Sequence, residues 1–293
     1  MYQIILYYKY VFIANPAKLV AEQKTLCAEL NLKGRILIAP EGINGTLEGT
    51  IESISSYCEA LKNNPLFSDI DIKKSEGTGS AFPKLMIKVR DEIVSSHLAP
   101  GVADPLRQTG KYLSAEELHN WFEVGKEFYI VDMRNDYETS AGVFENSIPS
   151  RLGNFRNLPE VLKNLEHLKD KTIVTVCTGG VRCEKASAFL IENGFADVYQ
   201  LQNGIVTYME KYPNQHFKGK LYVFDQRILM GFNTDSAEHQ VVGKCLHCKT
   251  PSEHFVNCAN DDCHLHFICC EACMPNGTAY CSKVCSEKKI VLA

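Results

Sequence analysis

Residues 172–190 read TIVTVCTGGVRCEKASAFL and place Cys177 between a strand and a helix. Thr172 to Val176 is rich in β-branched residues and lacks polar alternation, which is typical of a parallel strand covered on both faces. We expect a helix after Cys183 as far as Asn193, with Gly194 as a candidate for its C-terminal cap. Cys177 then stands at the carboxyl end of a strand, where ligands bind in open parallel sheets.

The loop that follows Cys177 favours a nucleophilic thiolate. Gly-Gly lets the backbone wrap tightly so that several N–H groups point inward, and the start of the helix adds positive potential. Both effects lower the pKa of a thiol, and Arg182 adds positive charge at the rim. A structural cysteine beside an ordinary turn is disfavoured, because strand, cysteine, glycines, arginine and helix occur in the order a site requires. The predicted binding loop comprises Thr178, Gly179, Gly180 and Val181.

Residues 112–213, which contain this loop, are expected to form an α/β domain. A capping box of Ser114 and Glu117 opens the first helix, which runs through Trp121. Strands that alternate with helices indicate a mostly parallel sheet. The strands are expected at 128–132, 172–176 and 198–201, and a further helix at 158–168.

Residues 1–95 are expected to form a smaller domain. The first six of its predicted elements follow the order βαββαβ, which suggests a ferredoxin-like α+β fold. Pro40-Glu41-Gly42 and Asn44-Gly45 are turn signals, and Cys27 and Cys58 fit small buried hydrophobic positions. The strands are expected at 4–13, 35–39, 46–47, 70–73 and 85–89, and the helices at 18–30 and 51–61.

Two further regions complete the chain. Residues 96–111 contain two prolines and two glycines, which is typical of a linker. Residues 214–293 are expected to hold a hairpin, formed by 221–224 and 227–231, and then a cysteine-rich segment. This segment has too few large apolar residues to build a core unaided.

The composition is that of an ordinary globular protein, with 45% hydrophobic and 23% charged residues among 293. Lys and Arg number 31 against 35 Asp and Glu, so the chain has no global attraction to nucleic acid, and any RNA contact must come from a local patch. No apolar run is long enough to cross a membrane. The N-terminal MYQIILYYKYVFIANP reads as a strand rather than a signal peptide, so we expect a cytoplasmic protein.

Nine of the 13 cysteines fall between Cys245 and Cys285, and this cluster predicts bound metal. Each short spacing brings two thiolates within reach of one ion, so four such pairs provide ligands for about two structural zinc ions. The spacing leaves Cys269 as the spare cysteine. A disulfide framework is disfavoured in the cytoplasm. The predicted ligands are Cys245, Cys248, Cys258, Cys263, Cys270, Cys273, Cys281 and Cys285.

The pairing of these ligands stays open at the level of sequence. An interleaved arrangement joins the first pair with the third and the second with the fourth, whereas a sequential arrangement joins neighbours. His247, His254, His264 and His266 could replace a cysteine, although each also fits a surface or packing position.

Residues 112–213 resemble the rhodanese superfamily. VDMRNDYETSAGVFENSI, residues 131–148, is similar to the family segment in which Asp-x-Arg follows a strand. The resemblance implies that Asp132 and Arg134 organise the site and that Glu138 supports it, although Glu138 also fits a surface salt-bridge cluster. The family's usual histidine is absent after Gly142, so its role does not transfer.

The length of the cysteine loop separates two chemistries on this fold. The loop from Cys177 to Arg182 has six residues. The related dual-specificity phosphatases have one more, which makes room for a phosphate, so the shorter loop resembles the type that carries sulfur as a persulfide. Cys183 either attacks a persulfide on Cys177 to form a disulfide, modifies its reactivity, or packs within the helix.

A closer resemblance covers nearly the whole chain. RILIAPEGINGTLEG (35–49), CTGGVRCEKAS (177–187) and CLHCKTPSEHFVNCANDDC (245–263) are similar to the bacterial tRNA uridine hydroxylases of the rhodanese superfamily. The resemblance implies tRNA as partner, molecular oxygen as co-substrate, carbon five of the wobble uridine as the site of reaction, and Cys177 as the essential residue.

Two other functions remain open from the sequence. One is a rhodanese-type sulfurtransferase with a persulfide on Cys177, and the other is a zinc-dependent interaction module on a rhodanese scaffold. The intact Cys177 loop disfavours the module. The sequence carries no flavin, haem or nicotinamide signature, and it leaves the activation of oxygen unexplained.

Overall fold

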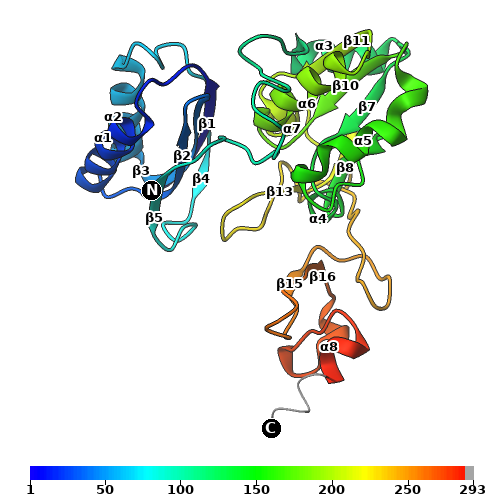
Figure 1. Cartoon of the computed structure of the whole chain (residues 1–293). Coiled ribbons are helices and arrows are strands. Elements are labelled where there is room, and N and C mark those ends of the chain that lie inside the picture. The colour runs from blue at the N-terminus through cyan, green and yellow to red at the C-terminus, as the bar shows by residue number, and fades with distance from the viewer. Residues whose placement is uncertain (288–293) are drawn as a thin grey trace.

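The computed structural model describes residues 1–287, which form three successive parts (Figure 1). The N-terminal part is a five-stranded sheet in the order β4-β1-β3-β2-β5. The first four strands pair antiparallel, and β5 adds parallel to β2. The elements are β1 (Tyr2–Tyr10), α1 (Pro16–Glu29), β2 (Lys33–Ala39), β3 (Gly42–Thr50), α2 (Ile51–Asn63), β4 (Ile72–Gly77) and β5 (Leu85–Val89). The predicted ferredoxin-like α+β fold is confirmed.

The two faces of this sheet have different roles. Both helices cover one face, and the other turns toward the central domain (Figure 1). Strand β1 illustrates the alternation that a sheet imposes. Ile5 and Tyr7 pack into the core beneath the helices, whereas Leu6 and Tyr8 point into a cavity between the two domains. The open face is therefore available for a site.

The prediction of a turn at Asn44-Gly45 is wrong. Both residues lie inside β3, where Gly45 pairs with Tyr7 and Asn44 with Tyr8. Strands β2 and β3 are joined earlier, since Ala39 already pairs with Gly42. A Cβ atom on Gly45 would come within 2.3 Å of the Tyr7 ring. The glycine is thus explained by close packing across strands and not by a turn.

The central domain has a five-stranded sheet in the order β6-β11-β10-β7-β9, and all of its pairs are parallel. Helices α5 and α6 cover one face, and α3 and α7 cover the other. The elements are β6 (Lys111–Leu113), α3 (Ala115–Glu123), β7 (Tyr129–Asp132), α4 (Asp136–Thr139), β8 (Gly142–Phe144), β9 (Ile148–Pro149), η1 (Phe155–Asn157), α5 (Leu158–Leu165), η2 (Glu166–Leu168), β10 (Thr172–Val176), α6 (Val181–Glu192), β11 (Asp197–Leu201) and α7 (Gly204–Lys211).

The predicted signals for the start of the first helix and for the end of the helix after Cys183 are confirmed in this domain. Ser114 and Glu117 form the predicted capping box at the start of α3. Helix α6 begins at Val181, so Arg182 and Cys183 both lie in its first turn. Asn193 ends the helix and Gly194 follows with a φ of 85°, a conformation that glycine adopts without strain. The sequence analysis did not identify strands β6, β8 and β9, which have two or three residues each, or helix α7, which has eight residues like α5.

The C-terminal part begins by adding to the central domain and ends in a cysteine-rich knot (Figure 1), whose Phe255 and Ile268 pack with Ala141 of the central domain. Strand β12 pairs antiparallel with β8, and β13 and β14 form the predicted hairpin. The elements are β12 (Phe217–Gly219), β13 (Leu221–Tyr222), β14 (Leu229–Met230), β15 (Phe255–Asn257), β16 (His266–Ile268), η3 (Glu271–Cys273), η4 (Pro275–Gly277) and α8 (Lys283–Glu287). Within residues 1–287, no helix has the length and apolarity to span a membrane.

Helix α6 carries most of the polar contacts between the first two domains. The Lys185 ammonium pairs with Glu41 at 2.9 Å and with Glu92 at 2.7 Å. The hydroxyl of Tyr8 donates to Glu184 at 3.1 Å, and that of Tyr10 donates to the carbonyl of Val181 at 3.2 Å. The helix that follows the Cys177 loop is therefore the element on which the N-terminal domain docks.

Candidate active site and metal centres

The Cys177 loop is built as a cradle around one sulfur atom. Cys177 follows β10 directly, and the backbone N–H of Gly180 donates to its Sγ at 3.2 Å. Gly180 has a φ of 104°, which glycine tolerates and side-chain-bearing residues rarely adopt. The N–H of Cys183 closes the turn by donating to the carbonyl of Gly180 at 2.9 Å.

The cradle lowers the pKa of Cys177. Burial by itself raises this pKa, because it disfavours the charged form. The hydrogen bond from the Cys183 side chain, the charge of Arg182 and the backbone N–H groups of the loop act in the opposite direction, and together they bring the pKa to about 6. Cys177 is therefore mostly a thiolate near neutral pH, as the sequence predicts.

The position of Arg182 corrects the expectation of a charge at the rim. Its guanidinium is buried, and it donates to Glu138 at 2.6 and 2.8 Å and to the Thr178 hydroxyl at 3.2 Å. Glu138 is also fully buried, so it does not belong to a surface cluster. Despite burial, the Arg182 charge lowers the pKa of Glu138. This bidentate ion pair holds the loop in position. The negative charge of Glu138 compensates the positive charge of Arg182.

Asp132 and Arg134 form a second buried pair, which supports the loop from behind. Arg134 donates to Asp132 at 2.6 and 2.9 Å and to the carbonyl of Gly142 at 2.7 Å. The N–H of Met133, between them, donates to the carbonyl of Val176 at 2.9 Å. Neither Asp132 nor Arg134 lines the cavity next to Cys177. Their position fits the organising role that the resemblance implies, and contact with a substrate in this cavity would not involve them.

The start of α7 contributes to the site although the sequence analysis did not identify it. The N–H of Ile205 donates to the carbonyl of Cys177 at 2.9 Å, and that of Val206 donates to the carbonyl of Thr178 at 3.1 Å. A Cβ atom on Gly204 would meet the Thr178 carbonyl at 2.6 Å. Asn203-Gly204, with both residues at positive φ, was the available signal for this tight approach.

Strand β1 of the N-terminal domain closes over the loop. A Cβ atom on Gly179 would come within 2.8 Å of Leu6, and one on Gly180 within 2.6 Å of the Tyr8 hydroxyl. Each contact is too close for a side chain. The two glycines therefore allow the domains to meet, in addition to letting the loop turn.

A cavity of about 420 Å³ lies between the open face of the N-terminal sheet and the Cys177 loop. This volume is within the range of small-ligand sites. Cys177, Thr178, Gly179 and Val181 of the predicted loop border it, and Gly180 does not. Further walls come from β1, β2, β3 and β4, from residues 93–95 and 154–156, from Asn135 and Val206, and from the segment around β13. A site at the domain interface was not predicted.

The cavity wall is strongly basic. Six cationic side chains border it against a single acidic one, Asp225. Arg227 is paired with Asp225 at 2.7 Å. The cationic side chains differ in their exposure to solvent. Arg35, Lys74 and Arg156 are exposed, whereas Lys73 is largely buried. The cationic residues are Arg35, Lys73, Lys74, Arg156, Arg182 and Arg227. The balanced charge of the whole chain hides this local patch.

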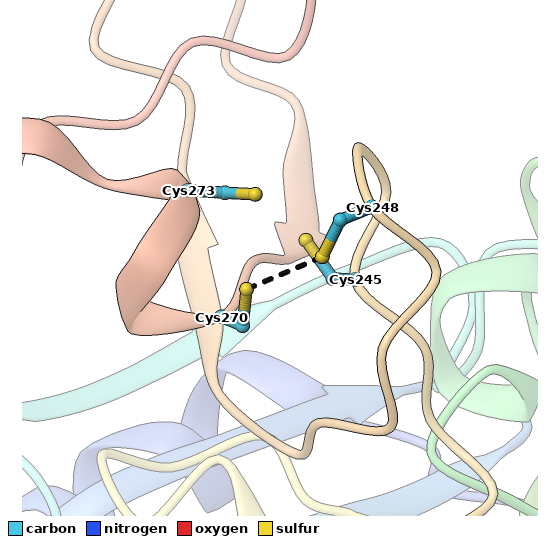
Figure 2. Close-up of side chains that lie close together, drawn as sticks. All are labelled: Cys245, Cys248, Cys270 and Cys273. Atoms are coloured by element: carbon cyan, nitrogen blue, oxygen red, sulfur yellow. Dashed lines mark hydrogen bonds between the residues drawn. The ribbon is translucent and has the colours of Figure 1, made fainter.

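The cysteine-rich part gathers its thiols into two sets of four. One set is Cys245, Cys248, Cys270 and Cys273, whose sulfur atoms face a common centre (Figure 2). The other is Cys258, Cys263, Cys281 and Cys285. In each set, all the sulfur atoms lie within 4.8 Å of one another. The first pair thus joins the third and the second joins the fourth, which is the interleaved alternative.

The geometry of both sets fits a metal ion. The sulfur atoms of Cys248 and Cys270 are 3.5 Å apart, and those of Cys263 and Cys281 are 3.6 Å apart. These separations far exceed a disulfide bond. They approach the edge of about 3.8 Å in a tetrahedron with metal–sulfur bonds of about 2.3 Å. Cys269 belongs to neither set, and none of His247, His254, His264 and His266 joins one.

Three segments of the chain match known families in order. Residues 2–93 match the UPF0176 acylphosphatase like domain, residues 114–211 the rhodanese-like domain, and residues 218–286 the rhodanase C-terminal family. A tRNA uridine(34) hydroxylase from Cytophaga hutchinsonii is 42% identical over 97% of this chain and 89% of its own length.

The chain belongs to the tRNA uridine(34) hydroxylase family. Other members include proteins of that name from Bacillus licheniformis, 44% identical over 92% of this chain and 84% of its own, and from Staphylococcus carnosus, 42% identical over 98% and 90%. The resemblance stated from the three sequence blocks is thus confirmed. In this family member, the rhodanese-like domain holds the Cys177 loop, and the N-terminal domain completes the wall around it.

We predict that Cys177 alkylates first among the thiols outside the two sets of four cysteines. Its labelling by limiting iodoacetamide should rise as the pH increases through about 6, because the thiolate is the reactive form. Cys58 is the control, since burial raises its pKa and it should stay unlabelled over the same range. Peptide mapping measures both. Preferential labelling of Cys58 or Cys27 would contradict the assignment of the site.

Proposed function

We propose that this chain hydroxylates carbon five of uridine 34 in tRNA with molecular oxygen. One observation carries the proposal: a thiolate-forming cysteine borders a basic cavity between two domains. The named activity of the relatives supports it. A tRNA substrate also supports a cytoplasmic location.

The cavity suits a base that is turned out of its stack in the anticodon loop. Enzymes that modify a base turn it out of its stack into a pocket, and this costs least where the strand is already single. Phe224 is half exposed on the cavity wall and offers a face for base stacking. Arg35, Lys74 and Arg156 are exposed cations at the positions that flanking phosphates would reach.

Cys177 has the properties of the reacting group. Its thiolate form provides a polarisable nucleophile where the base would enter, and the N–H groups of the loop keep it charged. The buried Arg182–Glu138 pair keeps the loop in place, so the sulfur is held in one position before the substrate arrives.

We further propose that each of the two cysteine sets holds one zinc ion. Four thiolates at tetrahedral spacing form a closed structural site, and a metal there crosslinks a segment that is poor in large apolar residues. The ligand sets lie in the C-terminal part, whereas Cys177 lies in the central domain. The zinc sites therefore stabilise the fold.

The zinc content tests this assignment. Purified protein should contain about two zinc ions per chain. Cys245→Ser should lose about one of them, because a closed site needs all four thiolates. Cys269→Ser should keep both, since Cys269 lies outside either set. Elemental analysis provides the count. A folded protein that is free of metal, or equal zinc loss in both variants, would refute the assignment.

The activity is tested in a strain that lacks the gene and is complemented with each variant. The wild type should restore 5-hydroxyuridine to tRNA, and Cys177→Ser should abolish it while the protein stays folded, because serine keeps the shape and loses the thiolate. Cys58→Ser is the control, in a helix of the N-terminal domain. Mass spectrometry of nucleosides gives the readout. Full hydroxylation by Cys177→Ser would disprove the role of the cysteine.

An assay of the purified wild-type protein separates this function from the sulfurtransferase alternative. If the wild type transferred sulfur from thiosulfate to cyanide efficiently and left tRNA unchanged, the sulfurtransferase function would replace the hydroxylase.

The basic wall predicts a salt-sensitive affinity for tRNA. Arg35→Ala should weaken binding about tenfold and lower the slope of log affinity against log salt by roughly 0.7, the value for one phosphate contact in a single strand. Arg107→Ala is the control, because Arg107 is exposed but does not border the cavity. Equilibrium binding at several salt concentrations measures the slope. An equal effect of both substitutions would place the tRNA elsewhere.

A further inference from the structure

Cys183 lies directly behind the reactive sulfur. Both Cys177 and Cys183 have no exposed surface. The two hydrogen bonds that close the loop, from Gly180 to the Cys177 sulfur and from Cys183 to the Gly180 carbonyl, bring the ends of the loop together. The Cys183 side chain lies near enough to lower the pKa of Cys177, and only Cys177 borders the cavity. A substrate would therefore meet Cys177 first, and Cys183 only through Cys177.

The two thiols are differentiated by their surroundings. The pKa of Cys177 is lowered, whereas burial and the neighbouring Cys177 raise the pKa of Cys183 well above its ordinary value. A reactive thiolate at the cavity and a neutral thiol behind it form the arrangement in which one cysteine is oxidised and the second resolves it.

The proposed reaction needs two electrons. Hydroxylation inserts one atom of oxygen into the C5–H bond, and the second atom must be reduced to water. Two thiols that become a disulfide release two electrons and two protons. The balance is uridine plus oxygen plus two thiols on one side, and 5-hydroxyuridine plus water plus one disulfide on the other.

We propose that Cys177 and Cys183 form the dithiol that supplies these two electrons, with Cys183 as the resolving thiol. This inference rests on the proposed hydroxylase function and deepens it. It assigns to Cys183 a role that neither helix packing nor the tuning of Cys177 would require.

The steps can be written so that every atom is placed. Oxygen first adds at C5 of uracil: a C5–O bond forms, the C5–H bond breaks, and its hydrogen moves to the outer oxygen, which gives a hydroperoxide. The Cys177 sulfur then attacks the outer oxygen, the O–O bond breaks, and the products are 5-hydroxyuridine and a sulfenic acid on Cys177. The Cys183 sulfur attacks Cys177, an S–S bond forms, and the hydroxyl leaves with the Cys183 proton as water. A small dithiol, reaching Cys177 through the cavity, reduces the disulfide for the next cycle.

A single-turnover experiment tests the inference on the full chain. The protein is reduced with dithiothreitol, freed of reductant without oxygen, and then mixed with excess tRNA and oxygen. We expect equal amounts of 5-hydroxyuridine and of a Cys177–Cys183 disulfide, measured by nucleoside and peptide mass spectrometry. Renewed addition of dithiothreitol should restore turnover.

Substitution of Cys183 separates its role from that of packing. Cys183→Ser and Cys183→Ala should both slow multiple turnover by at least about tenfold, and dimedone should trap the sulfenic acid on Cys177. Cys27→Ala is the matched control, because Cys27 is equally buried but lies in the N-terminal core. It should hydroxylate at the rate of the wild type and give no trapped sulfenic acid.

The outcomes distinguish the two proposals. If the wild type forms 5-hydroxyuridine while both thiols stay reduced, or if the Cys183 variants turn over at the wild-type rate, the dithiol is refuted and the hydroxylase function stands. If the wild type forms no 5-hydroxyuridine under any condition, the hydroxylase function fails, and the dithiol fails with it.

Discussion

The close approach of strand β1 to the Gly179–Gly180 turn is the constraint on which the site depends. Leu6 and Tyr8 lie where a side chain on either glycine would be, so a side chain at either position would displace the end of Leu6 or Tyr8 from the loop. Glu184, in the first turn of α6, then accepts a hydrogen bond from the hydroxyl of Tyr8 at 3.1 Å. The contact encloses a cavity that neither domain forms alone, and Cys177 lies at its edge.

Buried ion pairs hold this arrangement rigid. Arg182 with Glu138, and Arg134 with Asp132, are each removed from water and joined by two short hydrogen bonds. Removing one partner of such a pair costs about 3–5 kcal/mol, because an unpaired charge remains inside. These residues therefore act through the loop, and the groups left to meet a substrate are the Cys177 sulfur, the cavity wall and its exposed cations.

The cysteine-rich C-terminal knot depends on a different kind of stabilisation. Its segment is short and poor in large apolar side chains, so burial of apolar surface stabilises it little. The interleaved cysteine sets link residues distant in sequence, and two metal ions would supply the missing free energy of folding. Strand β12, which pairs with β8, ties the start of this part to the central domain close to the carbonyl that Arg134 binds.

The sequence by itself determined whatever depends on neighbouring residues. A buried strand, a cysteine, two glycines and a helix start follow one another within a few positions, so the nucleophile and its lowered pKa were predictable, as were the cysteine pairs and the order of elements in the N-terminal domain. Only the tertiary structure decided what depends on distant residues. The partner of Arg182, the pairing of the cysteine sets and the basic cavity join segments far apart in the chain, and Tyr8 meets Glu184 across 176 positions. The conformational propensities of neighbouring residues do not predict such contacts, because the contacts form only when whole domains pack and exclude water.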